Sequence, residues 1–215
     1  MTSDASNGLF ERTTTALGPG AVVLHRYAIA IERELLADIR RVIDEAPFRN
    51  MVTPGGYTMS VAMSTCGEVG WVTDRSGYRY SETDPLTGRN WPAMPSSLRR
   101  LAQDAARDAG YGGFAPDSCL INRYDIGAKM GLHQDKDERD FDAPIVSVSL
   151  GLPATFLWGG AKRSDRTTKV PLEHGDVVVW GGASRLFYHG VSQVKAGHHP
   201  FLGNCRINLT FRKAH

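Results

Sequence analysis

Two histidines and an aspartate have the residue types and the spacing of a metal site. In His133-Gln134-Asp135 two ligand-type side chains stand two positions apart, so both project to the same face of an extended backbone. His189 follows an apolar Val-Val-Val-Trp run, where we expect a strand to give way to a turn. Two imidazoles and one carboxylate leave part of an octahedron open, as in non-haem Fe(II) oxygenases. The sequence therefore predicts catalytic iron at these three residues; hydrolytic zinc, or surface polar residues beside a core histidine, are the alternatives.

A strand late in the chain carries a candidate anion site. From Cys205 to Arg212 polar and apolar residues alternate strictly, so the polar ones share one face of a strand. An ordinary solvated face would give the same pattern. Inside a small barrel, however, two arginines on that face could hold a dicarboxylate by paired, charge-assisted hydrogen bonds. The residues concerned are Arg206, Asn208, Thr210 and Arg212, together with Leu120, Asn122 and Tyr124 on one face of an earlier strand.

Two helices and a series of short strands must position these residues. Apolar residues at helical spacing predict amphipathic helices over residues 30–45 and 96–109. From residue 118 onward the pattern changes to short β-type runs, namely SCLINRY, PIVSVSLG, ATFLW, DVVVWG and CRINLTFR, separated by turn residues. Helices first and strands afterwards indicate an α+β fold, with a jelly roll or sandwich of antiparallel strands braced by the N-terminal helices.

The composition is that of one globular domain. Of 215 residues, 41% are hydrophobic and 22% charged, so we expect a single domain over residues 19–215 after a flexible tail of residues 1–18. No apolar run could span a bilayer and no signal peptide is recognisable, so we expect a cytoplasmic protein without a membrane partner. Three widely spaced cysteines are expected to be buried thiols. A net charge of +2 permits an anionic partner without requiring one.

Residues 50–80 are rich in methionine, aromatic residues and glycine, and we predict glycine-hinged hairpins there. Their apolar residues could simply cover the core. Flat rings and pliable methionines also suit a pocket for a base that has been flipped out of a stack. Four basic residues within positions 161–169 are similarly ambiguous, because they could form a solvated loop or contact phosphates.

Seven longer segments carry a family resemblance. They are MVTPGGYTMSVAM, DSCLINRY, LHQDKDE, PIVSVSLGLPA, LEHGDVVVWGG, SRLFYHG and RINLTFR. Together they resemble the AlkB family of DNA dealkylation dioxygenases, and the likeness covers nearly the whole chain from about residue 20. The resemblance implies a double-stranded β-helix core, Fe(II) at the predicted triad and a nucleotide-recognition lid at about residues 50–80. It also implies that 2-oxoglutarate is bound by Asn122, Tyr124, Arg206, Asn208 and Arg212.

The same resemblance implies the reaction. Fe(II), O2 and 2-oxoglutarate would oxidise N-alkylated bases such as 1-methyladenine and 3-methylcytosine, releasing formaldehyde, succinate and CO2. The expected partner is alkylated DNA, preferentially single-stranded, with RNA as an alternative, and no obligate protein partner is implied. A dioxygenase that hydroxylates a small molecule and a non-catalytic metal-binding barrel remain alternative functions. The implied substrate contacts are Met63, Trp71, Tyr78, Asp137 and Arg163, although Asp137 could instead belong to a solvated charge run.

Overall fold

An eight-stranded antiparallel sheet dominates the fold. The computed structural model describes residues 13–215. The strand order in this large sheet is β1-β2-β12-β9-β14-β7-β4-β3. In chain order its strands are β1 (Thr14–Gly18), β2 (Ala21–Leu24), β3 (Arg49–Val52), β4 (Thr58–Gly67), β7 (Ser118–Asp125), β9 (Ile145–Gly151), β12 (Val177–Trp180) and β14 (Cys205–Arg212).

A four-stranded antiparallel sheet packs against the inner face of the large sheet. Its order is β11-β10-β13-β8, with β8 (Met130–His133), β10 (Ala154–Trp158), β11 (Thr168–Leu172) and β13 (His189–Val191). Large side chains of both sheets form one inner core, in which the rings of Phe156 and Trp158 on β10 lie about 6 Å from Trp180 on β12. Two antiparallel sheets that share a core are consistent with the expected jelly roll.

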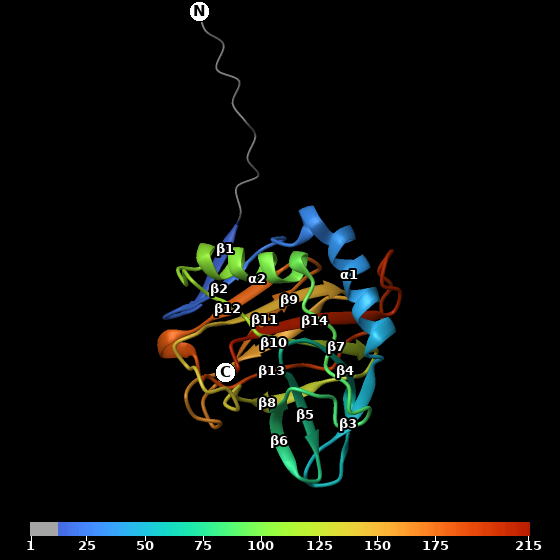
Figure 1. The fold of residues 1–215 in the computed structure, drawn as a ribbon. Coiled ribbons are helices and arrows are strands. Elements are labelled where there is room, and N and C mark those ends of the chain that lie inside the picture. The colour runs from blue at the N-terminus through green and yellow to red at the C-terminus, as the bar shows by residue number, and fades with distance from the viewer. Residues whose placement is uncertain (1–12) are drawn as a thin grey trace, which may run out of the picture.

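Two helices cover the outer face of the large sheet (Figure 1). They are α1 (Glu32–Glu45), which follows the short 3-10 helix η1 (Ile29–Ile31), and α2 (Ser96–Asp108). Their apolar stripes, represented by Leu35 and Leu98, share a second core with outward-facing strand residues such as Val146 and Leu209. The predicted ranges 30–45 and 96–109 therefore match these helices closely, because the apolar spacing was strong in both.

The side chains of β14 point alternately to the two sides of the large sheet, as the sequence predicts. Ile207, Leu209 and Phe211 pack in the helix-covered outer core. The intervening polar residues point to the opposite, inner side, where each is 6% exposed or less. The alternative of a solvated face is therefore wrong for this strand, because both faces of the sheet are covered. The buried inner residues are Arg206, Asn208, Thr210 and Arg212.

Two predicted boundaries differ from the structure. The predicted flexible tail does not extend to residue 18, since Thr14–Gly18 pairs with β2 as β1, while residues 1–12 lie outside the described residues. Within the predicted lid at about residues 50–80, β3 and β4 belong to the large sheet. Only β5 (Gly70–Asp74) and β6 (Gly77–Ser81) form a separate hairpin, which Figure 1 shows on the side away from α1 and α2. In the described part of the chain we find no helix with the length and apolar character that crossing a bilayer requires.

Candidate active site

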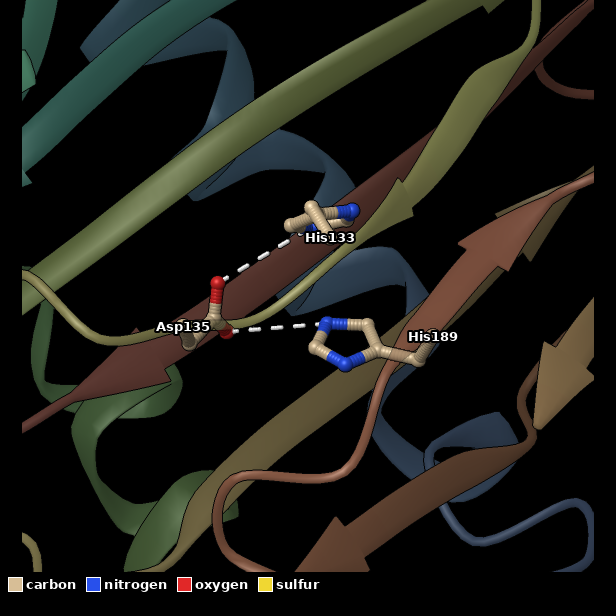
Figure 2. Close-up of side chains that lie close together, drawn as sticks. All are labelled: His133, Asp135 and His189. Atoms are coloured by element: carbon tan, nitrogen blue, oxygen red, sulfur yellow. Dashed lines mark ion pairs between the residues drawn. The ribbon is translucent and has the colours of Figure 1, made fainter. Parts of the chain in front are cut away.

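Two paired strands hold the histidines of the predicted metal site. His133 ends β8 and His189 begins β13, and the antiparallel register places the two residues opposite each other. Gly190 permits this pairing, because a Cβ there would stand 2.8 Å from the Met130 carbonyl oxygen. Asp135 lies in the irregular segment after β8, so the predicted extended backbone ends at His133. Figure 2 shows the Asp135 carboxylate nevertheless directed at both imidazoles.

The three side chains converge on one point. The Asp135 carboxylate oxygens lie 3.8 Å from Nε2 of His133 and 3.9 Å from Nε2 of His189. The Nδ1 atoms of the two imidazoles each lie 2.9 Å from a backbone carbonyl oxygen, that of Gly131 and that of Phe187 respectively. Donation of these hydrogen bonds requires the proton on Nδ1, which leaves each Nε2 lone pair free to bind a metal.

The electrostatics keep Asp135 and His189 in metal-binding protonation states. Burial alone would raise the pKa of Asp135, but the Arg212 guanidinium, followed by the two imidazoles, outweighs burial and holds that pKa well below its usual range. Burial, assisted by the neighbouring His133, lowers the pKa of His189 to about 4. At neutral pH Asp135 is therefore anionic and His189 is neutral, the forms that coordinate a metal.

The donor set fits Fe(II). Two imidazole nitrogens and one carboxylate make the facial arrangement that non-haem Fe(II) sites use. The metal-type cluster contains only these three residues among the described part of the chain. Three ligands exclude a structural zinc site, which requires a fourth protein ligand, and leave positions open on a catalytic metal. Arg212 donates to both oxygens of Asp135, at 3.1 and 2.9 Å, and so fixes the orientation of the only anionic ligand.

Arg206 provides a buried guanidinium that has no anionic partner. Arg206 is 1% exposed, and its Nη2 donates to Ser149 Oγ at 2.9 Å. Its Nε and Nη1 have no hydrogen-bond partner, and the Tyr124 ring lies 5.0 Å from its central carbon. Burial lowers the pKa of Arg206. Because an unpaired buried charge is costly, two unpartnered donors on this side chain indicate a site for an anionic ligand.

Amide groups beside Arg206 are held in fixed positions by the neighbouring strand. Asn208 donates to Ser147 Oγ at 2.8 Å and to the Val148 carbonyl at 3.0 Å. Asn122 donates to Asn208 Oδ1 at 3.3 Å, while its own Oδ1 has no partner. Arg212 Nη1 is likewise buried without a partner. These groups complete a polar cavity wall with unused hydrogen-bonding capacity.

One cavity of about 460 Å³ unites the predicted sites, a volume typical of small-ligand pockets. The triad lines it, and so does every residue predicted to bind 2-oxoglutarate. The predicted substrate contacts Met63, Trp71, Tyr78, Asp137 and Arg163 line it as well. The structure thus brings together residues from β4, the β5–β6 hairpin and the barrel strands that are far apart in sequence.

The outer end of the cavity is built from aromatic and charged side chains. Trp71 and Tyr78 stack across the β5–β6 hairpin, with ring centroids 5.6 Å apart. The indole Nε1 of Trp71 donates to Asp137 Oδ2 at 2.8 Å, so Asp137 faces the cavity as well as solvent. Arg163 Nη1 donates to the Leu132 carbonyl at 2.6 Å. Met63, in contrast, is 1% exposed and lies deep in the cavity.

Several residues around the cavity were not singled out from the sequence. Ser147 and Ser149 on β9 bond Asn208 and Arg206, and their spacing within PIVSVSLG could have revealed them, because two serines alternate with core valines. Glu138 and Arg185 are buried at 6% and 2% exposure and form an ion pair behind the triad. No sequence pattern points to that pair, because the two residues come from different loops.

Comparisons with known proteins agree with this site. Residues 20–212 match the family model described as the 2OG-Fe(II) oxygenase superfamily. The Escherichia coli (strain K12) protein named alpha-ketoglutarate-dependent dioxygenase AlkB is 62% identical over 198 residues, which are 92% of this chain and 92% of that protein. An Arabidopsis thaliana protein named DNA N(6)-methyladenine demethylase ALKBH1C is 30% identical over 93% of this chain and 49% of its own length.

A solved structure gives the same result for the fold. The structure titled "The structure of OsALKBH1" superposes with a TM-score of 0.80 at 32% identity, covering 94% of this chain and 100% of that one. The predicted resemblance and the predicted iron and 2-oxoglutarate chemistry are thereby confirmed. The chain belongs to the 2OG-Fe(II) oxygenase superfamily and, within it, to the AlkB family of alpha-ketoglutarate-dependent dioxygenases.

Proposed function

We propose that this dioxygenase repairs alkylated DNA by oxidative demethylation of N-alkylated bases such as 1-methyladenine and 3-methylcytosine. The observation that carries the proposal is a single cavity with three different walls: an iron-type triad, a buried arginine with unused donors, and a stacked aromatic pair. The overall reaction consumes O2 and 2-oxoglutarate and releases succinate, CO2 and formaldehyde. The relative named as a DNA demethylase supports a nucleic-acid substrate.

The inner wall binds the co-substrate in this proposal. Arg206 would hold the distal carboxylate of 2-oxoglutarate through its two unpartnered donors. Asn122, Tyr124 and Asn208 lie around it, and Arg212 would contribute Nη1 near the metal. When Fe(II) is bound by the triad, it supplies the oxidising chemistry with O2. The chain's own part is to leave coordination positions open and to keep the site free of bulk water.

The outer wall holds the base. Trp71 and Tyr78 would stack on one face of a flipped base, and His133 would bound the other face. The β5–β6 hairpin therefore serves as the nucleotide-recognition lid, with β3 and β4 as its connection to the large sheet. Asp137 would attract lesions that carry positive charge, since 1-methyladenine and 3-methylcytosine are cationic near neutral pH.

The backbone of the nucleic acid would lie along a basic rim. Lys162, Arg163 and Arg166 come from the segment that joins β10 to β11, and Lys169 lies at the start of β11. Arg163 also lines the cavity. Cationic side chains beside a base pocket contact phosphates and make binding weaken with salt. Base flipping costs least in an unpaired strand, so we expect single-stranded DNA in the cytoplasm to be the preferred substrate, with RNA as a second candidate.

Succinate formation tests the function against its two alternatives. We expect wild-type protein with Fe(II), ascorbate and 2-oxoglutarate to form succinate faster with a 1-methyladenine oligonucleotide than with the same oligonucleotide unmethylated. A dioxygenase for a small molecule would form succinate equally slowly with both oligonucleotides. A non-catalytic barrel would form none. An equal rate with both oligonucleotides would therefore overturn the proposed substrate class.

A further inference from the structure

A chain of buried polar contacts joins the β5–β6 hairpin to the metal ligand Asp135. It begins at Tyr80 on β6, whose hydroxyl donates to Glu138 Oε1 at 2.6 Å. Glu138 Oε1 also lies 3.3 Å from Arg212 Nε. Arg212 in turn holds both carboxylate oxygens of Asp135, at 3.1 and 2.9 Å. Three consecutive contacts thus connect the lid of the cavity with its metal ligand.

A second arginine, Arg185, holds the carboxylate of Glu138 and the backbone of Asp135. Arg185 Nη2 donates to Glu138 Oε2 at 3.1 Å, and Arg185 Nη1 donates to the backbone carbonyl of Asp135 at 2.7 Å. Its Nε donates to the Ala143 carbonyl at 3.0 Å, so the guanidinium is anchored on three sides. The Oε1 atom of Glu138 therefore contacts both Tyr80 and Arg212, and its Oε2 atom contacts Arg185. Both arginines also bond Asp135.

Burial makes this cluster act as a unit. Asp135, Glu138, Arg185 and Arg212 are each 7% exposed or less, and their two positive and two negative charges balance. A buried carboxylate that lost these partners would be left uncompensated at a high energetic cost. Glu138 cannot follow a movement of Tyr80 without disturbing an arginine that orients Asp135. Groups coupled in this way respond together when either end moves.

The geometry points to Glu138 as a positioning residue that couples closure of the β5–β6 hairpin to the orientation of Asp135, and so restricts oxidation to the closed, substrate-bound site. The inference rests on the proposed function for the identity of the substrate that closes the hairpin, but the coupling is a property of the protein itself. Coupling is reciprocal, so occupation of the metal and co-substrate sites must also stabilise the hairpin. That reciprocal effect can be measured without turnover.

Hydrogen exchange of residues 70–81 provides the direct test. We expect Mn(II) with 2-oxoglutarate, a combination that gives no turnover, to slow amide exchange of this hairpin by about tenfold in the wild-type protein. One charge-assisted hydrogen bond, such as that from Tyr80 to Glu138, stabilises by an amount of that size. Tyr80→Phe should abolish most of this protection while binding Mn(II) within about threefold of wild type, because both arginine pairs of Glu138 remain. Glu138→Gln should abolish the protection as well and also weaken Mn(II) binding by about tenfold or more, because it disturbs the arginines that orient Asp135. Arg79→Ala is the matched control, because Arg79 pairs with Asp74 inside the same hairpin and does not touch Glu138.

Two results would overturn the inference. One is full protection of the hairpin in Tyr80→Phe, and the other is an equal loss of protection in Arg79→Ala. If Glu138→Gln does not fold, Tyr80→Phe decides alone, because it removes one hydroxyl and leaves both arginine pairs intact. A second readout is the ratio of succinate to demethylated base, which should rise about threefold or more in Tyr80→Phe if uncoupled oxidation increases. Failure of wild-type demethylation would refute the proposed function, while the exchange result would still decide the coupling.

Discussion

The two ends of the cavity differ in how firmly their side chains are held. At the inner end Asp135, His189, Arg206 and Arg212 are all 7% exposed or less, and backbone or side-chain partners fix their orientation. At the outer end Tyr78 is 51% exposed, and Asp137 and Arg163 are exposed as well. Oxidation requires fixed geometry around one small co-substrate, whereas recognition must admit different bases and a strand of nucleic acid. Substitutions at the inner end should therefore cause large and uniform losses of activity, and substitutions at the outer end small losses that depend on the substrate.

The largest effect is expected for Asp135→Asn. The substitution keeps the side-chain size and an acceptor for Arg212 but removes the only anionic metal ligand. Turnover should fall by more than about a hundredfold, since even residues that merely orient metal ligands cost up to that factor. Iron content and succinate formation are the measurements. Wild-type turnover by a variant that still contains iron would remove Asp135 from the ligand set.

The second prediction concerns pH and the metal-free protein. The unfolded chain protonates His189 near its ordinary pKa of 6.5, whereas the folded protein protonates it only near 4. Between these values the unfolded state binds the extra proton, so the free energy of unfolding falls as the pH falls, by up to about 3 kcal/mol. Asp135 adds to this loss of stability only below its ordinary pKa of 3.8, because its pKa in the folded state is lowered. Urea unfolding from pH 7 to pH 4.5 should show a steeper loss for wild type than for His189→Asn. Parallel curves would contradict a depressed pKa.

The third prediction concerns the co-substrate. Arg206→Lys keeps a positive charge but loses the planar pair of donors, so the apparent KM for 2-oxoglutarate should rise by about ten- to thirtyfold. Arg123→Lys is the control, because Arg123 is an exposed arginine on the neighbouring β7 whose ion pair is with Asp125, outside the cavity. Titration of 2-oxoglutarate against succinate formation measures both. An unchanged KM in Arg206→Lys would show that this arginine does not hold the co-substrate.

At the outer end the effect should be smaller and should depend on the lesion. Asp137→Asn keeps an acceptor for the Trp71 indole and removes only the negative charge. We expect kcat/KM to fall about fivefold on cationic 1-methyladenine and 3-methylcytosine, and hardly at all on neutral 1-methylguanine or 3-methylthymine, because the exposed carboxylate is partly screened. Equal losses on charged and neutral lesions would exclude Asp137 from substrate discrimination.

The smallest effect is expected at the basic rim. Replacing both Lys162 and Arg166 by alanine should weaken binding of every oligonucleotide about two- to threefold and reduce the dependence of log Kd on log salt by about one to two. The control is the double alanine variant of Arg100 and Arg107, two exposed arginines of α2 on the outer face of the large sheet. A salt dependence that changes equally in both variants would place the nucleic acid elsewhere.

The sequence predicted the inner end better than the outer end, for a physical reason. Strict alternation in CRINLTFR reflects local backbone geometry, which is kept in any fold that buries one face of the strand. The His133-Gln134-Asp135 spacing predicted the correct metal ligands, although the backbone is no longer extended at Asp135. Whether Arg206 and Arg212 lie in a solvated face or a buried cavity could not be decided locally. That depended on the second sheet, whose strand β13 has only three residues and no recognisable pattern.

Contacts between the β5–β6 hairpin and distant loops could not be predicted from the sequence. The hydrogen bond from Trp71 to Asp137 and the cluster of Glu138 with Tyr80 and Arg185 join residues that are tens of positions apart. The sequence also predicts His189 where a strand gives way to a turn, whereas His189 begins strand β13. The reason is that the loop between Trp180 and His189 contains a short 3-10 helix, η2 (Gly182–Ser184), that no periodicity signals. The family resemblance, rather than spacing, supplied the lid and the substrate contacts.

Digestion and mass analysis of a single-stranded oligonucleotide that contains 1-methyladenine measures the chemistry most directly. After incubation of the wild-type protein with Fe(II), ascorbate and 2-oxoglutarate, we expect adenine to replace 1-methyladenine, with formaldehyde released in equal amount. Asp135→Asn should leave the methylated base intact under the same conditions. Persistence of 1-methyladenine with the wild-type protein, while succinate is formed, would contradict a base-demethylating function and leave an oxygenase with another substrate.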